Sequence, residues 1–320
     1  MTTRCPARAR SARTKTISRR SAVAGPIAVL LARWGLSPER AYGQEAGCSG
    51  GACLCPCAET ACLLFELGKR DEGEVSFLIP LGLAFGPDGS LYLADYHGGR
   101  VYVLDTRGVL RGSLGSPGTG DGQFSRPAAI GVAPDGTVYV SDFLSNRIQS
   151  FDTDGTYLGQ WGTEGSGDGE FASPGGVAVA GDGTVYVADG NNHRIQYFDA
   201  SGGYLGQWGS AGSGAGQFNT PFDVAVAGDG TVYVADSMNY RIQKFDATGA
   251  FLGAWGKEGD GDGEFSFPVD IAVRDDGAVF VVDPVLGVQV FDVAGAYLGR
   301  WGSEGQFATA DGIAISPDGT

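Results

Sequence analysis

A 47-residue step recurs through most of this 320-residue chain, and it limits the possible folds more than any other feature. Aspartates follow this step at Asp95, Asp142, Asp189, Asp236 and Asp283. Prolines keep the same step at Pro80, Pro127, Pro174, Pro221 and Pro268. Phenylalanines do so at Phe77, Phe124, Phe171, Phe218 and Phe265. Repetition at a fixed period of this length is typical of an array in which each unit packs against its neighbours.

Each unit is predicted to contain four short strands. In the third unit these are residues 176–180, 184–188, 194–198 and 204–208, and Gly181-Asp182-Gly183 carries the Asp-Gly signal of a hairpin. Glycine makes up 55 of the 320 residues and disfavours helix, whereas the 42 % apolar content is ample for a core. The chain is therefore expected to be all-β. Four-stranded meanders bury both faces when packed around an axis, which predicts a β-propeller.

Several motifs then resemble a known family. Asn192-His193-Arg194-Ile195 is a literal N-H-R-I, and P-x-G-V-A-V, D-G-T-V-Y-V-A-D and G-x-G-D-G-x-F stretches recur around it. Over roughly residues 63–320 the chain is similar to NHL-repeat proteins, which implies a six-bladed propeller of four-stranded antiparallel blades. The fifth unit departs from the pattern, because Pro284-Val285-Leu286-Gly287 follows Asp283 and the repeated arginine is missing.

The register predicts five complete blades and part of a sixth. The complete blades lie near residues 80–115, 127–162, 174–209, 221–256 and 268–302, and the partial blade covers 309–320. Residues 63–67 match a fourth strand, since Leu64 aligns with Leu158 and Leu67 with Trp161. We expect this N-terminal strand to become the outer strand of the truncated last blade and so to close the ring. The two absent strands suggest a sequence short by roughly 20–30 residues.

Residues 1–46 have the features of an export signal. They carry nine Lys or Arg and two acids, and the apolar run 22–31 follows the basic stretch. Ser18-Arg19-Arg20-Ser21 resembles the bacterial twin-arginine motif, and Ala41-Tyr42-Gly43 offers a small-residue cleavage site. We therefore expect a protein exported to the periplasm or the cell exterior. A mitochondrial transit peptide is the alternative, and Pro26 and Arg33 leave the run too short for a transmembrane helix.

Residues 47–62 form a cysteine-rich segment. Five cysteines fall in the spacing C-x4-C-x-C-x-C-x4-C, at Cys48, Cys53, Cys55, Cys57 and Cys62. In an oxidising compartment this density favours two local disulfides and one free thiol. A metal or iron–sulfur site is an alternative, although no histidine lies nearby. Ala46-Gly47-Cys48 is also compatible with a lipoprotein signal, although Glu45 takes a place where an apolar residue is wanted.

The charge of the remaining chain bears on its partners. Residues 47–320 carry 13 basic and 35 acidic side chains, a net charge of −22. A body this acidic repels phosphate backbones, so nucleic acid is not expected as a partner.

Candidate site residues are those that differ from blade to blade, because repeated residues serve blade construction. The Asp/Arg pairs such as Asp189 and Arg194, and the outer-strand tryptophans, are repeated and so assigned to the scaffold. We define the loop face as the end of the ring formed by the loops before each first strand and those joining strands two and three. Its variable ligand-binding candidates are Tyr96, His97, Phe143, Leu144, Asn191, His193, Phe222, Met238 and Tyr240, with Val285 and Leu286 in the fifth unit. The alternative is that each ring packs onto its own loop.

Acidic residues mark one side of the predicted channel mouth. Asp223 and Asp270 stand two residues after adjacent strand-one prolines, and Asp311 is close to the matching point of the sixth unit. They could hold a cation such as calcium, or a cationic ligand. The Gly-Asp-Gly loops at Asp121, Asp168 and Asp262 also suit calcium, or are simply turns.

Two functions follow from these features. The first is a non-enzymatic scaffold that needs no cofactor and binds a protein, peptide or glycan on its loop face. The second is a calcium-dependent hydrolase or lyase at the central channel. Lyases that resemble this chain use several histidines, and the chain contains only His97 and His193.

Overall fold

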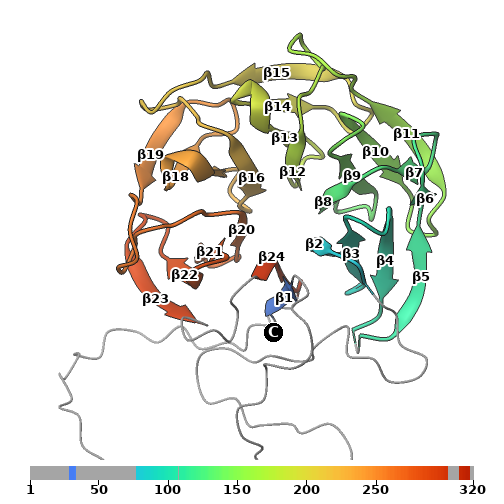
Figure 1. Cartoon of the computed structure of the whole chain (residues 1–320), viewed down its shortest axis with the longest axis horizontal. Helices are drawn as coiled ribbons and strands as arrows, with labels where there is room; N and C mark the ends of the chain where they lie inside the picture. Colours follow the sequence, from blue (N-terminus) through green and yellow to red (C-terminus); the bar gives the residue numbers. More distant parts are fainter. Residues whose placement is uncertain (1–28, 34–76, 107, 302–309, 318–320) are drawn as a thin grey trace, which may run out of the picture.

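The computed structural model describes residues 29–33, 77–106, 108–301 and 310–317, and it shows a ring of five four-stranded antiparallel sheets around a central axis (Figure 1). The fold is a β-propeller, as expected. Each blade is a meander whose first strand lies innermost and whose fourth strand lies at the rim.

The strand bounds repeat from blade to blade. Blade one contains β2 (Pro80–Phe85), β3 (Leu91–Asp95), β4 (Arg100–Leu104) and β5 (Leu110–Leu114). Blade two contains β8 (Pro127–Val132), β9 (Val138–Asp142), β10 (Arg147–Phe151) and β11 (Tyr157–Trp161). Blade three contains β12 (Pro174–Val179), β13 (Val185–Asp189), β14 (Arg194–Phe198) and β15 (Tyr204–Trp208). Blade four contains β16 (Pro221–Val226), β17 (Val232–Asp236), β18 (Arg241–Phe245) and β19 (Phe251–Trp255). Blade five contains β20 (Asp270–Val273), β21 (Val279–Asp283), β22 (Gly287–Phe291) and β23 (Tyr297–Trp301).

Short connecting elements complete the blades. Before blade two, β6 (Ser116–Pro117) and β7 (Gln123–Phe124) pair in parallel, and single bridges such as Glu164 to Phe171 take their place in later blades. Two 3-10 turns, η1 (Gly190–Asn192) and η2 (Ser237–Asn239), follow β13 and β17. None of the helical segments in the described residues is long and apolar enough to cross a bilayer.

Strand burial explains the apolar patterning. The second strands, such as β13, are buried along their whole length, since neighbouring blades cover both of their faces. The rim strands, such as β15, alternate between half-buried and exposed residues. The expected hairpin turn forms between β12 and β13, where Gly183 has a φ of +89° and Asp182 Oδ1 accepts the Thr184 N–H at 2.9 Å. The four strands predicted for this unit agree with the structure to within two residues at each end.

The hydrophobic core lies between the blades. One cluster joins Phe171 and Val187 of blade three to Tyr139 and Ile148 of blade two, and similar clusters join the other neighbours. The tryptophan column belongs to these interfaces, because Trp161 of β11 lies 5.7 Å from Phe198 of β14, measured between ring centroids. The large outer rings therefore fill the space that widens between blades, as predicted from the repeat.

The repeated Asp/Arg pair is also part of the scaffold. Arg194 Nε donates to Asp189 Oδ2 at 2.7 Å, and both groups are buried. The Arg194 guanidinium also donates to the carbonyl oxygens of Ser166, Gly167 and Glu170, at 2.7 to 2.9 Å. The pair thus fixes the loop that precedes the innermost strand as well as the corner between strands two and three. Blades two and four contain the same arrangement at Arg147 and Arg241.

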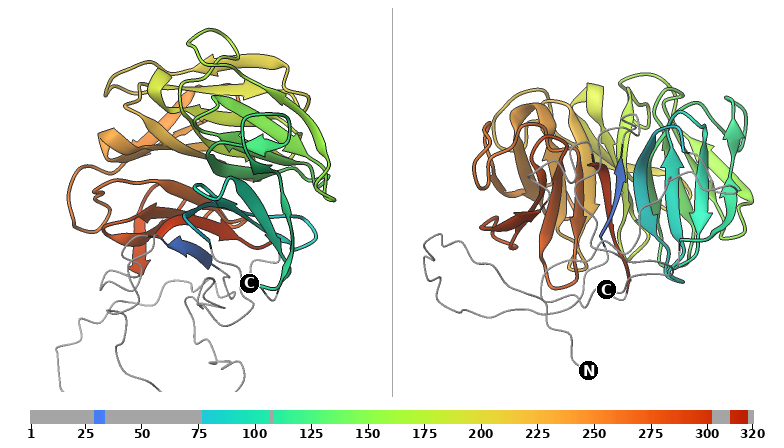
Figure 2. Two further views of the ribbon diagram at one scale, coloured as in Figure 1. Left: turned by 45° about the vertical axis from the view of Figure 1, so that its right-hand side comes forward. Right: turned by 60° about the horizontal axis from the view of Figure 1, so that its bottom comes forward.

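The sixth place in the ring differs from the prediction. It is taken by β24 (Ala310–Ile315), which lies between β20 and β2 and pairs antiparallel with β1 (Val29–Arg33), as the right-hand view of Figure 2 shows. Ile313 packs against blade five and Ala314 against blade one, so β24 links the two ends of the ring. The described residues therefore make five four-stranded blades and a two-stranded sheet rather than six blades.

The strand beside β24 is also not the one expected. Residues 63–67 were predicted to complete the last blade, and they lie outside the described residues. The ladder partner of β24 is β1, which falls within the segment 1–46 predicted to be an export signal. An open strand edge needs backbone partners, and residues 29–33, four apolar residues followed by Arg33, form a strand long enough to supply them. The cysteine-rich segment 47–62 lies outside the described residues.

Candidate functional site

The loop face is a real structural unit, because backbone hydrogen bonds join the loops assigned to it. The N–H of Tyr96 donates to the Ile79 oxygen at 2.8 Å, and the N–H of Phe143 donates to the Arg126 oxygen at 2.9 Å. In each case the residue after the second strand is held against the loop that leads into the innermost strand. Both kinds of loop therefore end at the same mouth of the channel.

A cavity of about 140 Å³ opens at this mouth, which we call the channel-mouth cavity. Its apolar wall consists of Leu81, Tyr96, Phe143, Phe222 and Val269. Its small-residue wall consists of Gly82, Ala128, Ala129, Gly175 and Gly176. Its acidic wall consists of Asp223, Asp270 and Asp311. A second cavity of about 190 Å³ continues along the axis, and the two share Gly82, Ala129, Asp223 and Asp270.

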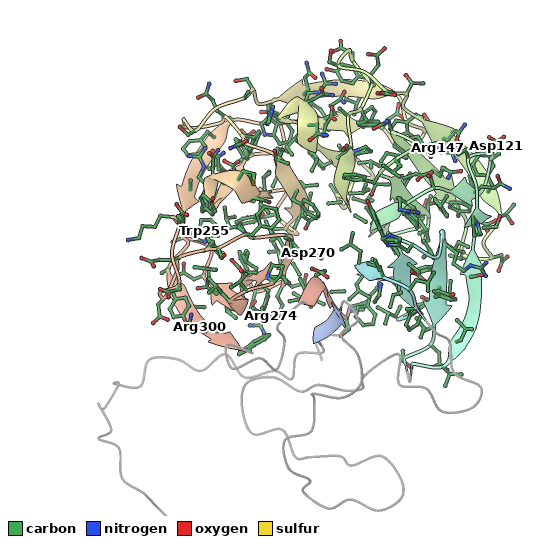
Figure 3. The ribbon with its side chains drawn as sticks, viewed as in Figure 1. Asp121, Arg147, Trp255, Asp270, Arg274 and Arg300 are labelled. Carbon is green, nitrogen blue, oxygen red and sulfur yellow. The ribbon has the colours of Figure 1, made fainter. Side chains whose placement is uncertain are left out.

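Asp223 and Asp270 brace the inner strands of neighbouring blades. Asp223 Oδ2 accepts the Ile271 N–H at 2.9 Å, and Asp270 Oδ2 accepts the Ile313 N–H at 3.1 Å. Each carboxyl thus joins its own strand to the next one around the axis. Asp270 lies at the inner edge of the ring, where β20 faces β24 (Figure 3).

These two acids also form a hydrogen-bonded pair with each other. Burial raises the pKa of Asp223 to about 6. Burial, together with the charge of Asp223, raises the pKa of Asp270 well above its usual range. Because two close carboxylates cannot easily both ionise, the proton that the pair shares lies on Asp270, which donates it to Asp223.

Asp311 has a different place and no such support. The bond from Ile313 to Asp270 parallels that from Ile271 to Asp223, so Gly312 occupies the ring position of the two aspartates. Asp311 therefore stands at the repeat position that Phe222 and Val269 occupy in their blades, one residue before the aspartates. Burial raises its pKa to about 6, and no hydrogen-bond partner for its carboxyl is found among the described residues.

The cavity carries no compensating positive charge in the described part of the chain. None of its lining residues is Lys, Arg or His. The Arg126 guanidinium packs on a residue of the cavity wall instead, with its central carbon 5.6 Å from the centre of the Tyr96 ring. The channel mouth is thus half apolar and half acidic.

The acids do not fit a calcium ion as they are arranged. Calcium takes six to eight oxygen ligands, whereas Asp223 and Asp270 direct oxygens to backbone N–H groups and to each other. No group of three or more His, Cys, Asp or Glu side chains suited to a metal ion occurs among the described residues.

The aspartates of the Gly-Asp-Gly loops form hydrogen bonds with tyrosine side chains. Asp168 hydrogen-bonds to the Tyr204 side chain, and Asp262 does the same with Tyr297. Asp121 pairs with Tyr157 and lies at the outer edge of the ring, away from Asp270 (Figure 3). These acids connect a loop to the rim strand of the following blade.

The structure brings together three of the nine predicted ligand-binding residues. Tyr96, Phe143 and Phe222 line the channel-mouth cavity, and the Tyr96 and Phe143 rings meet edge to face at 6.1 Å. His97 is exposed and packs edge to face against Tyr96 at 5.3 Å. Leu144 and Met238 are exposed on loops that follow second strands.

The other three residues serve as braces. His193 Nδ1 accepts the Thr220 N–H of the next blade at 3.0 Å, and Asn191 Nδ2 donates to Ser173 Oγ at 2.9 Å. Tyr240 is half-buried against a core cluster. Each of these side chains has its contact within the scaffold, so the structure does not group them with the cavity.

Sequence reasoning missed Leu81 and Val269. Each of them directly follows the repeated proline of its blade, so both stand at the same repeat position as Phe222. That position reads Leu, Ala, Gly, Phe and Val in the five blades, and this variation is the signal that could have revealed the apolar wall.

Comparisons with known proteins agree on the fold. The NHL repeat family model matches residues 171–198 and 218–245. No curated protein matches the chain in sequence. Among solved structures, streptogramin B lyase is 16 % identical, with a TM-score of 0.54 and coverage of 68 % of this chain and 67 % of that one.

Two further structures belong to proteins with different roles. A nidogen/laminin complex is 17 % identical, with a TM-score of 0.59 and coverage of 75 % of this chain and 86 % of that one. A gluconolactonase from Xanthomonas campestris is 19 % identical, with a TM-score of 0.55 and coverage of 69 % and 75 %. At these identities the likeness concerns the propeller fold.

Proposed function

We propose that this propeller is a binding module that holds a protein, peptide or glycan on its loop face, centred on the channel-mouth cavity. The observation that carries the proposal is the set of rings, Tyr96, Phe143 and Phe222, which line an open cavity, although Phe222 also packs against the core cluster of blade five. Aromatic side chains are enriched at the centres of binding surfaces.

The surroundings of the cavity support a contact surface. Leu144, Met238 and Val285 stand on three different loops with 55 %, 45 % and 67 % of their surface exposed. Loop tips ordinarily carry small polar residues, so exposed apolar side chains on three loops of the loop face favour a partner. The scaffold holds these loops by backbone and arginine hydrogen bonds, which limits the entropy lost on binding.

The cavity size bears on the kind of partner. At about 140 Å³ it is smaller than the roughly 300–1,000 Å³ of pockets that enclose a whole small molecule. One side chain or one sugar unit fits, and the rest of the partner lies across the loop face. This favours a peptide, a protein or a glycan over a small free metabolite.

We also propose the finer features that the sequence suggests. The ring is of the NHL type, its sixth blade is completed by strands outside the described residues, and the protein acts after export from a bacterial cell. The matched repeats, the position of β24 and the basic segment 1–46 support these proposals.

The test is selection of ligands on the purified, immobilised protein. A displayed peptide library and a glycan array are probed with the wild type and with two double variants. Phe143→Ser/Leu144→Ser alters the loop face, and Leu158→Ser/Leu205→Ser alters exposed leucines on the rim strands. We expect ligands that the loop-face variant loses and the rim variant keeps. Enrichment of no ligand, or equal loss by both variants, contradicts the proposal.

A hydrolase or lyase at the channel is the second candidate, although its acids are not arranged to hold the calcium ion that the sequence suggested. The carboxyl pair of Asp223 and Asp270 favours it, since perturbed acids are common in active sites. It has less support than binding, because the pair is engaged with the backbone of adjoining strands.

A further inference from the structure

We propose that the channel-mouth cavity receives a primary alkylammonium group, as at the end of a lysine side chain, with its methylene chain along the aromatic wall and its ammonium beside Asp311. The inference deepens the proposed function and rests on it, since the lysine belongs to the bound partner.

The size and shape of the cavity select a single slender group. About 140 Å³ is available at an opening lined by the start of each innermost strand and of β24. At the ring position of Asp223 and Asp270, blades one to three carry Gly82, Ala129 and Gly176, so no large side chain fills the cavity from that position. An unbranched chain can enter along the axis and reach the acidic wall.

The apolar wall suits the stem of a lysine. Tyr96 and Phe143 meet edge to face, and Phe222 joins the wall from blade four. Lysine buries its methylene groups along such surfaces while its ammonium stays polar. A nearby ring face adds a favourable cation–π contribution.

The acidic wall lacks a cation. Asp223 and Asp270 have backbone partners, whereas the carboxyl of Asp311 lines the cavity with no hydrogen-bond partner among the described residues. A half-buried carboxylate without a partner is unfavourable, and an ammonium group offers three donors to satisfy it. Asp223 adds further negative charge nearby.

A compact ammonium fits this wall better than a guanidinium. The planar guanidinium is best used by two parallel acceptors, whereas the carboxyl pair is already hydrogen-bonded within itself. The single carboxyl of Asp311 calls for a point charge on a flexible stem. The net charge of −22 on residues 47–320 also favours approach of a basic partner.

The experiment uses the full chain and acetylated, amidated Gly-Xaa-Gly tripeptides in ligand-observed NMR titrations. Xaa is lysine, norleucine, ε-acetyl-lysine or arginine. We expect lysine to bind at least tenfold more tightly than norleucine and ε-acetyl-lysine, and more tightly than arginine. Equal binding of lysine and norleucine, or tighter binding of arginine, overturns the inference.

Two variants locate the ammonium. Asp311→Asn should weaken binding of the lysine peptide at least tenfold, and Asp275→Asn, which removes one exposed charge on the hairpin between β20 and β21, should change it less than twofold. Unchanged affinity in Asp311→Asn contradicts the site. Should that variant fail to fold, the wild type still provides a test, because affinity for lysine should fall when the pH is lowered from 7.5 to 5 and that for norleucine should not.

The failure of this inference differs from failure of the proposed function. If ligands selected on the loop face bind and are lost in Phe143→Ser/Leu144→Ser, the binding module stands even where the lysine peptide shows no preference. If no ligand of any chemistry is selected on the loop face, the binding module itself is wrong.

Discussion

At the scale of single residues, the repeat makes each blade a control for the next. His193, Asn146 and Tyr240 occupy the same corner, and all three have positive φ values of 51° to 56°. Asn146 Oδ1 accepts the Ser173 N–H at 2.8 Å, and His193 Nδ1 accepts the equivalent Thr220 N–H at 3.0 Å. The histidine therefore replaces an asparagine as a bond between blades.

This equivalence predicts the outcome of two substitutions. His193→Ala should lower the free energy of unfolding by about 1 kcal/mol, because the Thr220 N–H loses its acceptor. His193→Asn should stay within about 0.5 kcal/mol of the wild type, because the amide restores the acceptor, as Asn146 does. Urea denaturation measures both. An equal loss in the two variants would show that the hydrogen bond is not what the histidine contributes.

Such a role could not be predicted from the sequence, because the partner of His193 lies 27 residues away in the next blade. The role of the Gly-Asp-Gly acids was more accessible. Blade four has Ala215 where Asp168 stands in blade three, and its rim strand has Phe251 where blade three has Tyr204. Loss of both partners together is the signature of a pair, and the structure places Asp168 against Tyr204.

At the scale of elements, arginine holds the leading loops of blades two, three and four to their blades. Arg194→Ala should cost about 3–5 kcal/mol, because Asp189 would be left buried without its partner. Amide exchange across residues 163–171 should speed up with it. Arg111→Ala is the matched control, since this arginine is 64 % exposed and faces Asp105 at 3.8 Å, and its cost should be below about 1 kcal/mol. Unchanged amide exchange in Arg194→Ala would show that the arginine does not hold this loop in place.

The strands themselves were largely predictable, whereas ring closure was not. A strand follows from local apolar pattern and turn residues, which recur five times in register. Closure depends on which distant segment meets β24, and sequence pattern gave residues 63–67 while the structure gives β1. Several short apolar runs can satisfy one open edge, so local pattern does not choose among them.

Processing of the N-terminus separates these alternatives. Export that removes residues 1–46 also removes β1. Hydrogen exchange of 310–315 should then be at least tenfold faster in a chain beginning at residue 47 than in the full chain, because β24 has lost its ladder partner. Equal protection would mean that another segment pairs with β24, and a Leu64→Pro variant of the shorter chain would test whether that segment is 63–67.

At the scale of the whole molecule, the channel is uneven around its axis. Blades one to three present Gly82, Ala129 and Gly176, and blades four and five present Asp223 and Asp270 at the same ring position. The five repeats share one backbone plan, so this asymmetry was readable from sequence. The pairing of the two acids was not, because it depends on their burial and their separation in space.

The engaged carboxyls predict little response to calcium. Adding 5 mM calcium after treatment with a chelator should move the Tm by less than about 1 °C. An ion present at about 100 times its Kd would add about 2.7 kcal/mol, which corresponds to several degrees. Differential scanning calorimetry of the chelated and calcium-loaded protein makes the comparison. A rise of that size would revive the metal-dependent candidate.

The acid pair also predicts how stability changes with pH. Folding raises the pKa of Asp223 from 3.8 to about 6 and also raises that of Asp270 well above its usual range, so the folded state holds these protons more tightly than the unfolded state. Their contribution is therefore complete below about pH 4 and is lost as the pH rises through 6 and above. Asp270→Asn keeps a donor for Asp223 and an acceptor for the Ile313 N–H, and it removes the titration.

The unfolding free energy of Asp270→Asn minus that of the wild type should therefore grow between pH 4.5 and 8.5, by about 1 kcal/mol or more. Asp276→Asn is the control, because hydrogen bonds from Arg274 lower the pKa of Asp276 below 3.8, so the contribution of this carboxylate is already complete above about pH 4 and its difference from the wild type should stay constant across the range. Urea denaturation across this range gives both differences. A difference for Asp270→Asn that stays constant with pH would mean that the two carboxyls do not share a proton. The channel mouth would then be more negatively charged, because both carboxyls would be ionised.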